Sequence, residues 1–333
     1  MIAPLVLAAA LLTAGPPDVA DAPRVVVTQT DDSKFPDITV YFELRKPDGT
    51  FVRDARSDEF RVAEDGRDRP VMAFEAPITV SSKPTTLVLV VDRSGSMREG
   101  DKIGGLKRAV RTFLDGLPEG SRVAVIAFGS DVELVCPFTT DRARVQAAVG
   151  RLRPFGGTRF FDAVDEALKL LETQSGRRAV LALTDGQDSD SIQAIDVPID
   201  EAKRLNLPVH TLGLGEGNEI DDASLDRIAA ETRGQTYRAR DAEGLKAIYQ
   251  ELAERLGSTY SLTYQTDRKV PDGTLRPIRV SYSKAPETSA GETAVFVPGM
   301  VVPAAGWPGL FLVLVLGMGV LAVLPGWVGR RAS

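Results

Sequence analysis

The sequence predicts an α/β protein whose central part forms a doubly wound, mostly parallel β-sheet flanked by helices. The first observation is a set of short strand-like runs with apolar residues on both faces, at residues 87–91, 123–128, 179–183 and 209–214. The second is helical spacing between and after these runs, as at Ile103, Leu106 and Val110. Doubly buried strands that alternate with amphipathic helices are typical of a parallel sheet covered on both faces. We place this part at residues 85–257.

Two flanking segments, residues 24–81 and 258–299, carry a strand pattern of another kind. Apolar and polar residues alternate at 38–45 and again at 278–282, which is the period of a half-buried strand. Each segment is too small to bury a core alone. We therefore expect the two segments to form one β-sandwich with the central part inserted between its strands. Two separate small β modules are the alternative.

The N-terminal end predicts export from the cytoplasm. Residues 1–22 combine an apolar run with Ala20-Asp21-Ala22, which fits a small-residue cleavage site, so we interpret them as a signal peptide. The segment departs from the usual pattern because no Lys or Arg precedes the apolar run. A buried N-terminal strand or helix is the alternative.

The C-terminal end predicts one transmembrane helix at residues 307–328. No charged residue lies between Glu292 and Arg330, and Trp307 and Trp327 fit the two interfaces of a bilayer. The arginines at the end place the C-terminus in the cytoplasm, so most of the chain is extracytoplasmic, either periplasmic or at the cell surface. A cleaved surface-sorting signal is the alternative to a retained anchor.

Composition excludes several kinds of site. The lone cysteine, Cys136, allows neither an internal disulfide nor a four-cysteine zinc site, and one histidine cannot form a His-rich metal site. A net charge of −6 argues against nucleic acid as a partner. We expect Cys136 in the core or on an edge strand, and His210 as a buried, hydrogen-bonded residue. Carboxylate and hydroxyl oxygens remain as the available ligands.

Five oxygen-bearing side chains are expected at one edge of the parallel sheet. Asp92, Ser94 and Ser96 follow the first apolar run, Asp185 follows the third, and Thr158 precedes a predicted helix. Ligands of such sheets bind at the carboxyl ends of the strands. Each piece alone is also consistent with a turn or a helix N-cap. Together, two carboxylates and three hydroxyls suit a hard cation, Mg²⁺ or Mn²⁺, better than zinc.

The motif Asp92-x-Ser94-x-Ser96, followed by Thr158 and Asp185, resembles the metal-ion-dependent adhesion site of von Willebrand factor A domains, which integrin I domains also carry. The resemblance covers residues 85–257, about half of the chain. It implies direct metal bonds from the three hydroxyls, and bonds through water or directly from the two carboxylates. It also implies an open coordination position that captures an Asp or Glu carboxylate of a protein partner.

We therefore expect a membrane-anchored, extracytoplasmic module for adhesion or complex assembly, which binds its protein partner through Mg²⁺ and is not an enzyme. A structural scaffold with a vestigial metal site is the first alternative, and a metal-dependent hydrolase is the second. Ser94 lies in Asp-Arg-Ser-Gly-Ser and not in the Gly-x-Ser-x-Gly of a nucleophile elbow, which favours binding over hydrolysis.

Overall fold

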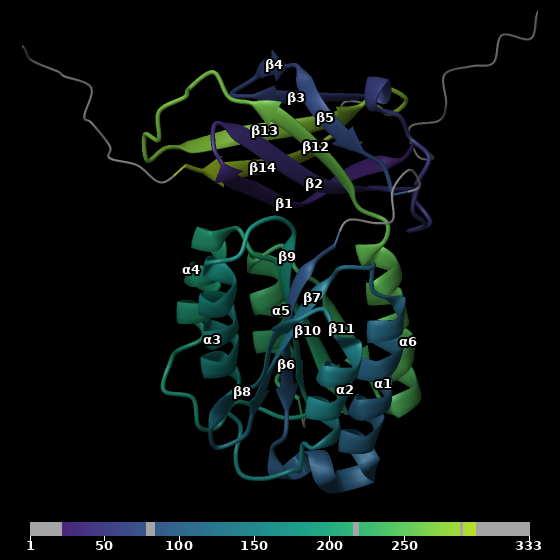
Figure 1. The fold of residues 1–333 in the computed structure, drawn as a ribbon, viewed down its shortest axis with the longest axis vertical. Coiled ribbons are helices and arrows are strands. Elements are labelled where there is room, and N and C mark those ends of the chain that lie inside the picture. Colours follow the sequence, from purple (N-terminus) through teal and green to yellow (C-terminus); the bar gives the residue numbers. More distant parts are fainter. Residues whose placement is uncertain (1–21, 78–83, 216–219, 287–288, 298–333) are drawn as a thin grey trace, which may run out of the picture. The chain divides into compact units, whose positions relative to one another are not determined.

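The computed structural model describes residues 22–77, 84–215, 220–286 and 289–297. The central part forms a six-stranded sheet in the order β11-β10-β9-β6-β7-β8 (Figure 1). Its strands are β6 (Thr86–Asp92), β7 (Arg122–Phe128), β8 (Val132–Thr139), β9 (Arg178–Thr184), β10 (Val209–Leu214) and β11 (Thr236–Ala239). All neighbours pair in parallel except β8, which is antiparallel to β7. The mostly parallel sheet is thus confirmed, with one antiparallel edge strand.

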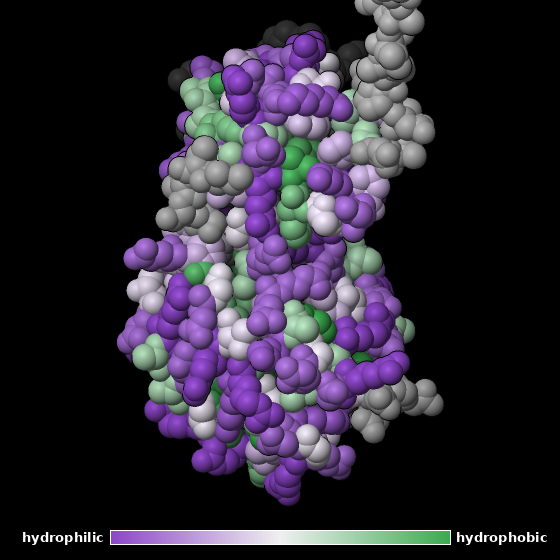
Figure 2. All heavy atoms as spheres, turned by 90° about the vertical axis from the view of Figure 1, so that its right-hand side faces the viewer, coloured by the Kyte–Doolittle hydropathy of each residue, from purple (hydrophilic) through white to green (hydrophobic). Residues whose placement is uncertain are grey.

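Helices cover both faces of this sheet (Figure 1). They are α1 (Lys102–Gly116), α2 (Arg142–Gly150), α3 (Phe160–Glu172), α4 (Asp196–Leu205), α5 (Asp222–Glu231) and α6 (Ala242–Leu256). Leu89 of β6 belongs to an apolar cluster with residues of α1, α2 and α6, whereas Val88 and Val90 belong to a second cluster with α3, α4 and α5. Because β6 is buried on both sides, every residue between Thr86 and Asp92 is apolar. Hydrophilic side chains predominate on the face drawn in Figure 2.

Two four-stranded sheets contain the strands outside the central part. One has the order β1-β2-β12-β5 and the other β14-β13-β3-β4. Their bounds are β1 (Arg24–Lys34), β2 (Asp37–Arg45), β3 (Phe60–Glu64), β4 (Arg67–Arg69), β5 (Val71–Glu75), β12 (Tyr260–Gln265), β13 (Leu275–Tyr282) and β14 (Gly291–Phe296). β12 pairs with both β2 and β5, and β13 pairs with β3. Strands that precede the central part therefore share sheets with strands that follow it.

Aromatic side chains pack these two sheets against each other. The ring of Phe60 on β3 lies 5.0 Å from that of Phe42 on β2 and 5.5 Å from that of Tyr260 on β12. Tyr282 on β13 adds a further ring at 5.2 Å from Phe60. The shared aromatic core explains how two short segments bury enough apolar surface when they pair.

The predicted signal peptide, residues 1–22, falls almost wholly outside the described residues, and the predicted transmembrane helix, 307–328, falls outside them entirely. Within the described ranges, each helix is too short or too polar to cross a membrane.

Cys136 and His210 lie where the sequence predicts. Cys136 is buried on the edge strand β8. His210 on β10 is buried, and its Nδ1 accepts a hydrogen bond from the backbone N–H of Gln235 at 3.2 Å. Burial, and after it the positive charges of Arg255 and Arg177, lower the pKa of His210 to about 3.

The depressed pKa of His210 predicts a loss of stability in acid. Because an unfolded histidine titrates near pH 6.5, protons bind preferentially to the unfolded chain below that pH. Above about pH 6.5 the titration of His210 does not reduce the free energy of unfolding. As the pH drops from there toward 3, it reduces this free energy by up to about 1.4 kcal/mol per pH unit. In urea unfolding between pH 7 and 4, His210→Gln should lose less stability than the wild type. Parallel pH profiles for the two chains would contradict this assignment.

Candidate metal centre

The register of two neighbouring strands positions both candidate carboxylates. β6 and β9 pair in parallel, with Val91 opposite Leu183, so Asp92 and Thr184 end the two strands side by side. Asp185 follows immediately after Thr184. The carboxyl ends of β6 and β9 therefore bring the two acidic residues to one edge of the sheet.

Two serine hydroxyls converge on Asp185. Ser96, in the 3₁₀ helix Gly95–Asp101, donates from Oγ to Asp185 Oδ1 at 2.7 Å. Ser94 Oγ lies 3.5 Å from the same carboxylate oxygen and 3.0 Å from Ser96 Oγ. The structure thus brings three of the five predicted ligands into direct contact.

Thr158 reaches the same place from the loop before α3. A Cβ built on Gly186 would lie 3.9 Å from Thr158 Oγ1 and 4.0 Å from Ser96 Oγ, so both hydroxyls face this glycine. The N–H of Gly95 donates to the carbonyl of Gly156 at 2.9 Å, which ties the serine loop to the loop that carries Thr158. Thr158 is therefore part of the cluster, although its hydroxyl does not touch the carboxylates.

Asp92 has a different environment from Asp185, because its own neighbours occupy both of its oxygens. Oδ1 accepts the backbone N–H of Ser94 at 2.6 Å, and Oδ2 accepts the hydroxyl of Thr184 at 2.7 Å. Burial raises the pKa of Asp92 to about 6, while these two hydrogen bonds act in the opposite direction. Asp92 therefore fixes the serine loop, and this position suits a ligand that acts through water.

The motif does not predict two further residues of the site. Thr184, which bonds Asp92, stands directly before Asp185 at the end of a buried strand, a position that could have indicated it. Lys102 at the start of α1 places Nζ 3.0 Å from Asp185 Oδ2, with its side chain only 16% exposed. Asp185 consequently presents Oδ1 to the serine hydroxyls and Oδ2 to the ammonium group.

The donor set fits a hard divalent cation. Asp92 and Asp185 are both buried, and among the described residues only the ammonium of Lys102 forms an ion pair with either of them, so this cluster of described side chains is one positive charge short of neutrality. Every candidate donor is an oxygen, which suits Mg²⁺ or Mn²⁺. Over the described ranges, no group of three or more His, Cys, Asp or Glu side chains could hold a metal. A bound cation here would therefore depend on hydroxyl ligands as well as on the two carboxylates.

The contact between Thr184 and Asp92 predicts a measurable stability loss at neutral pH. Thr184→Val keeps the shape of the side chain but removes one of two donors to a buried carboxylate. We expect a loss of about 1.5–3 kcal/mol in the free energy of unfolding, measured by urea denaturation at pH 7.5. Thr173→Val, at an exposed position, is the control and should change stability by less than about 0.5 kcal/mol. Equal effects of the two substitutions would show that the Thr184 hydroxyl contributes nothing.

Known proteins resemble the part of the chain that carries this site. Residues 87–187 match the von Willebrand factor type A domain. An uncharacterized protein of the cyanobacterium Synechocystis is 33% identical over 188 residues, which cover 53% of this chain and 42% of that protein. A UPF0353 protein of Nocardia farcinica is 26% identical over 239 residues, which cover 59% of this chain and 70% of that protein. The match thus spans less than half of the cyanobacterial relative.

A solved structure extends the similarity in fold. The von Willebrand factor type A protein from Catenulispora acidiphila aligns with 86% of this chain and 75% of its own, with a TM-score of 0.50 and 14% sequence identity. At this identity the likeness concerns the fold alone. Together with the family match, the mixed sheet and its flanking helices lead to one conclusion. This chain contains a von Willebrand factor type A domain.

Proposed function

We propose that the chain is a divalent-metal-dependent protein-binding module for adhesion or complex assembly. A single Mg²⁺, or Mn²⁺ in its place, would be held by Asp92, Ser94, Ser96, Thr158 and Asp185. The observation that carries the proposal is the convergence of the two serine hydroxyls on one oxygen of a buried carboxylate. The partner would present an Asp or Glu side chain.

The chain's own residues explain why an acidic partner is favoured. Neutral hydroxyls of Ser94 and Ser96 add no negative charge to the site, and Lys102 already compensates Asp185. When bound, the metal supplies an electrophilic coordination position for a carboxylate. Asp92 holds the serine loop through the backbone N–H of Ser94, so the hydroxyls are positioned before the partner arrives.

Recognition is better supported than hydrolysis. His210 pairs opposite Leu181, three residues before Thr184 along β9, which corresponds to a distance of about 10 Å along the sheet. The Ser94 hydroxyl contacts Ser96 and Asp185 instead of an imidazole base. A serine hydrolase would need the base within hydrogen-bond reach of its nucleophile.

The surface near the site also favours a protein partner. Phe155, three residues before Thr158, is 67% exposed, and its backbone N–H donates to the carbonyl of Arg93 in the serine loop. Ile192, whose backbone N–H donates to Asp162 in the first turn of the helix that follows Thr158, is 81% exposed. Large aromatic and aliphatic side chains around a polar centre are common anchors at protein interfaces.

We also propose that the chain is exported and anchored in the cell membrane, with the bulk of it extracytoplasmic. The support is the sequence pattern of residues 1–22 and 307–328. N-terminal sequencing of the chain from a membrane fraction should begin at Pro23. Retention of Met1 would contradict the signal peptide, and release of the chain by an alkaline carbonate wash would contradict the anchor.

The metal site predicts a Mg²⁺-dependent rise in thermal stability of the full chain. At about a hundred times its dissociation constant, a ligand stabilises the folded state by roughly 2.7 kcal/mol. The unfolding midpoint should rise with Mg²⁺ relative to EDTA for the wild type, but not for Asp185→Asn. Asp115→Asn, which removes an exposed carboxylate from α1, should keep the full response. A wild-type unfolding midpoint that changes with neither Mg²⁺ nor Mn²⁺ would favour the structural scaffold with a vestigial metal site.

A further inference from the structure

Two large apolar side chains are exposed where β13 begins and β14 ends. Leu275, the first residue of β13, is 64% exposed, and Phe296, the last residue of β14, is 43% exposed. The two strands are neighbours in their sheet. Two backbone hydrogen bonds hold the strand ends together, from the N–H of Gly273 to the carbonyl of Val297 at 3.0 Å and from the N–H of Val297 to the carbonyl of Thr274 at 3.3 Å. Leu275 and Phe296 therefore lie on adjacent strand ends.

Both side chains lie on the outer face of the sheet. The residues next to them, Arg276 and Val295, are buried on the opposite face, at 0% and 1% exposure. Further along the same strands, Arg279 Nε donates to Glu292 Oε1 at 2.9 Å, and both of these residues are exposed. Side chains two or four positions apart in a strand share a face, so this ion pair and the two apolar residues lie on one side of the sheet.

The loop before β13 adds a third exposed apolar residue without adding net charge. Val270 is 71% exposed, and Lys269 beside it is exposed as well. Residues 266–274, between β12 and β13, contain two acidic and two basic side chains, so their formal charge is zero. A ligand of this surface would therefore be attracted by apolar burial and not by a net charge of the loop.

The sequence brings this surface close to the predicted transmembrane helix. Residues 298–306, which carry no charge, separate Val297 from Trp307, the first residue of that helix. Even a fully extended chain of this length reaches no further than about 35 Å. A short tether of this kind gives a high effective concentration, so a weak contact between the surface and the bilayer would be largely occupied.

We propose that Val270, Leu275 and Phe296 form a membrane-contact surface that inserts into the interfacial layer of the bilayer beside the transmembrane helix. This inference rests on the proposed membrane anchor and adds a second contact to it. Lys269 would extend its ammonium group to the level of the lipid headgroups while its methylene groups cover apolar surface. Because the loop has no net charge, the contact would be similar with neutral and with anionic lipids. The ends of β13 and β14 would then be fixed at the membrane surface.

Site-specific fluorescent labels on the full chain in phosphatidylcholine vesicles test the proposal. The native Cys136 is 1% exposed, so a label reacts with a cysteine introduced at an exposed position. An environment-sensitive fluorophore on Leu275→Cys should emit at shorter wavelength and lose most of its emission to lipids that carry a nitroxide near the headgroup. The matched control is Leu134→Cys on β8, 42% exposed, which should keep its emission. Equal quenching at the two positions would overturn the proposal.

A third label, on Leu316→Cys in the predicted transmembrane helix, separates this proposal from the proposed anchor. Quenching at Leu316 but not at Leu275 would leave the anchor intact and overturn the membrane-contact surface. Quenching at Leu275 but not at Leu316 would support the surface and contradict the anchor, and no quenching at either position would overturn both. A label on Leu275→Cys that shifts to shorter wavelength without being quenched by lipid would mean that a second protein chain covers the surface, and would also overturn the proposal.

Hydrogen exchange in the same vesicles gives a readout that needs no label. The backbone amides of residues 266–274 should exchange faster in the double variant Leu275→Ser/Phe296→Ser than in the wild type, because the variant loses the apolar contact with lipid. Leu134→Ser, the control, should match the wild type. The difference should persist when anionic phosphatidylglycerol is added to the vesicles. Equal exchange in the double variant and the wild type would overturn the proposal.

Discussion

β6 and β9 pair in parallel from Thr86 to Val91, and the positions of Asp92 and Asp185 at the ends of these strands depend on that register. A slip by one residue would turn Asp92 to the opposite face of the sheet and separate it from Thr184. The register is held because β6 is buried on both faces, by α1 and α6 on one side and by α3 on the other. The large apolar core therefore fixes a small polar site that contributes little apolar burial of its own.

The two buried aspartates have different polar partners and therefore different roles. Asp92 uses its oxygens within the protein, on the Ser94 amide and the Thr184 hydroxyl, and so it shapes the loop. Asp185 shares its oxygens between the serine hydroxyls and Lys102. Similar residues at neighbouring strand ends thus have different tasks, and their immediate partners account for the difference.

The sequence predicts elements well where burial is complete and poorly where it is partial. All four runs with apolar residues on both faces form strands, because each lies inside a sheet covered on both faces. The sequence does not predict β8, because it is an edge strand with exposed Glu133 and Leu134. It does not predict β11 either, because this strand has only four residues. α2 buries little besides Val145 and Val149, too few apolar positions for a clear helical period.

The site shows the same limit of prediction from sequence. The spacing of Asp92, Ser94 and Ser96 indicates a cluster because neighbouring residues carry it, and the ends of parallel strands bring Asp185 to it. Lys102 has no such signal, since its contact depends on how α1 is placed against β9. The backbone N–H of Arg178 donates to Gln29, 149 positions earlier in the sequence, so only the folded chain reveals this contact. Metal ligation by the five residues stays a prediction.

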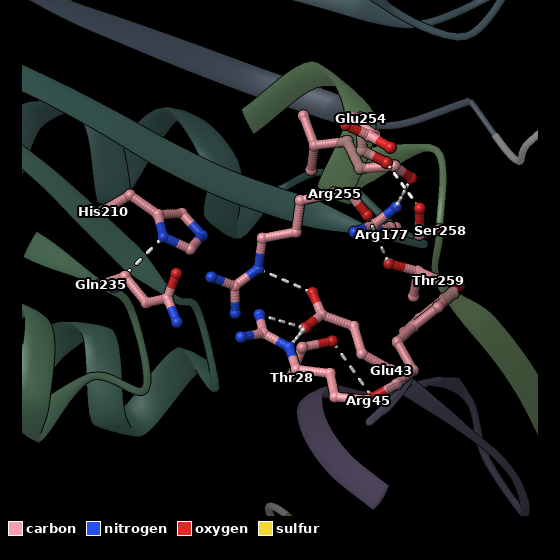
Figure 3. Close-up of polar contacts among 12 residues, drawn as sticks. Thr28, Glu43, Arg45, Arg177, His210, Gln235, Glu254, Arg255, Ser258 and Thr259 are labelled. Carbon is pink, nitrogen blue, oxygen red and sulfur yellow. Dashed lines mark hydrogen bonds and ion pairs between the residues drawn. The ribbon is translucent and has the colours of Figure 1, made fainter. Parts of the chain in front are cut away.

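The end of α6 has a mechanical consequence. Arg255 in its last turn binds Glu43 on β2 (Figure 3). After a connection of three residues the chain enters β12, which is hydrogen-bonded to β2 on one side and to β5 on the other. A pull along β12 would load hydrogen bonds on both of its edges at once, in shear, instead of opening them one after another. Tension arriving from the C-terminal side would therefore be shared by these two strand pairings and the Arg255–Glu43 ion pair before it reached α6.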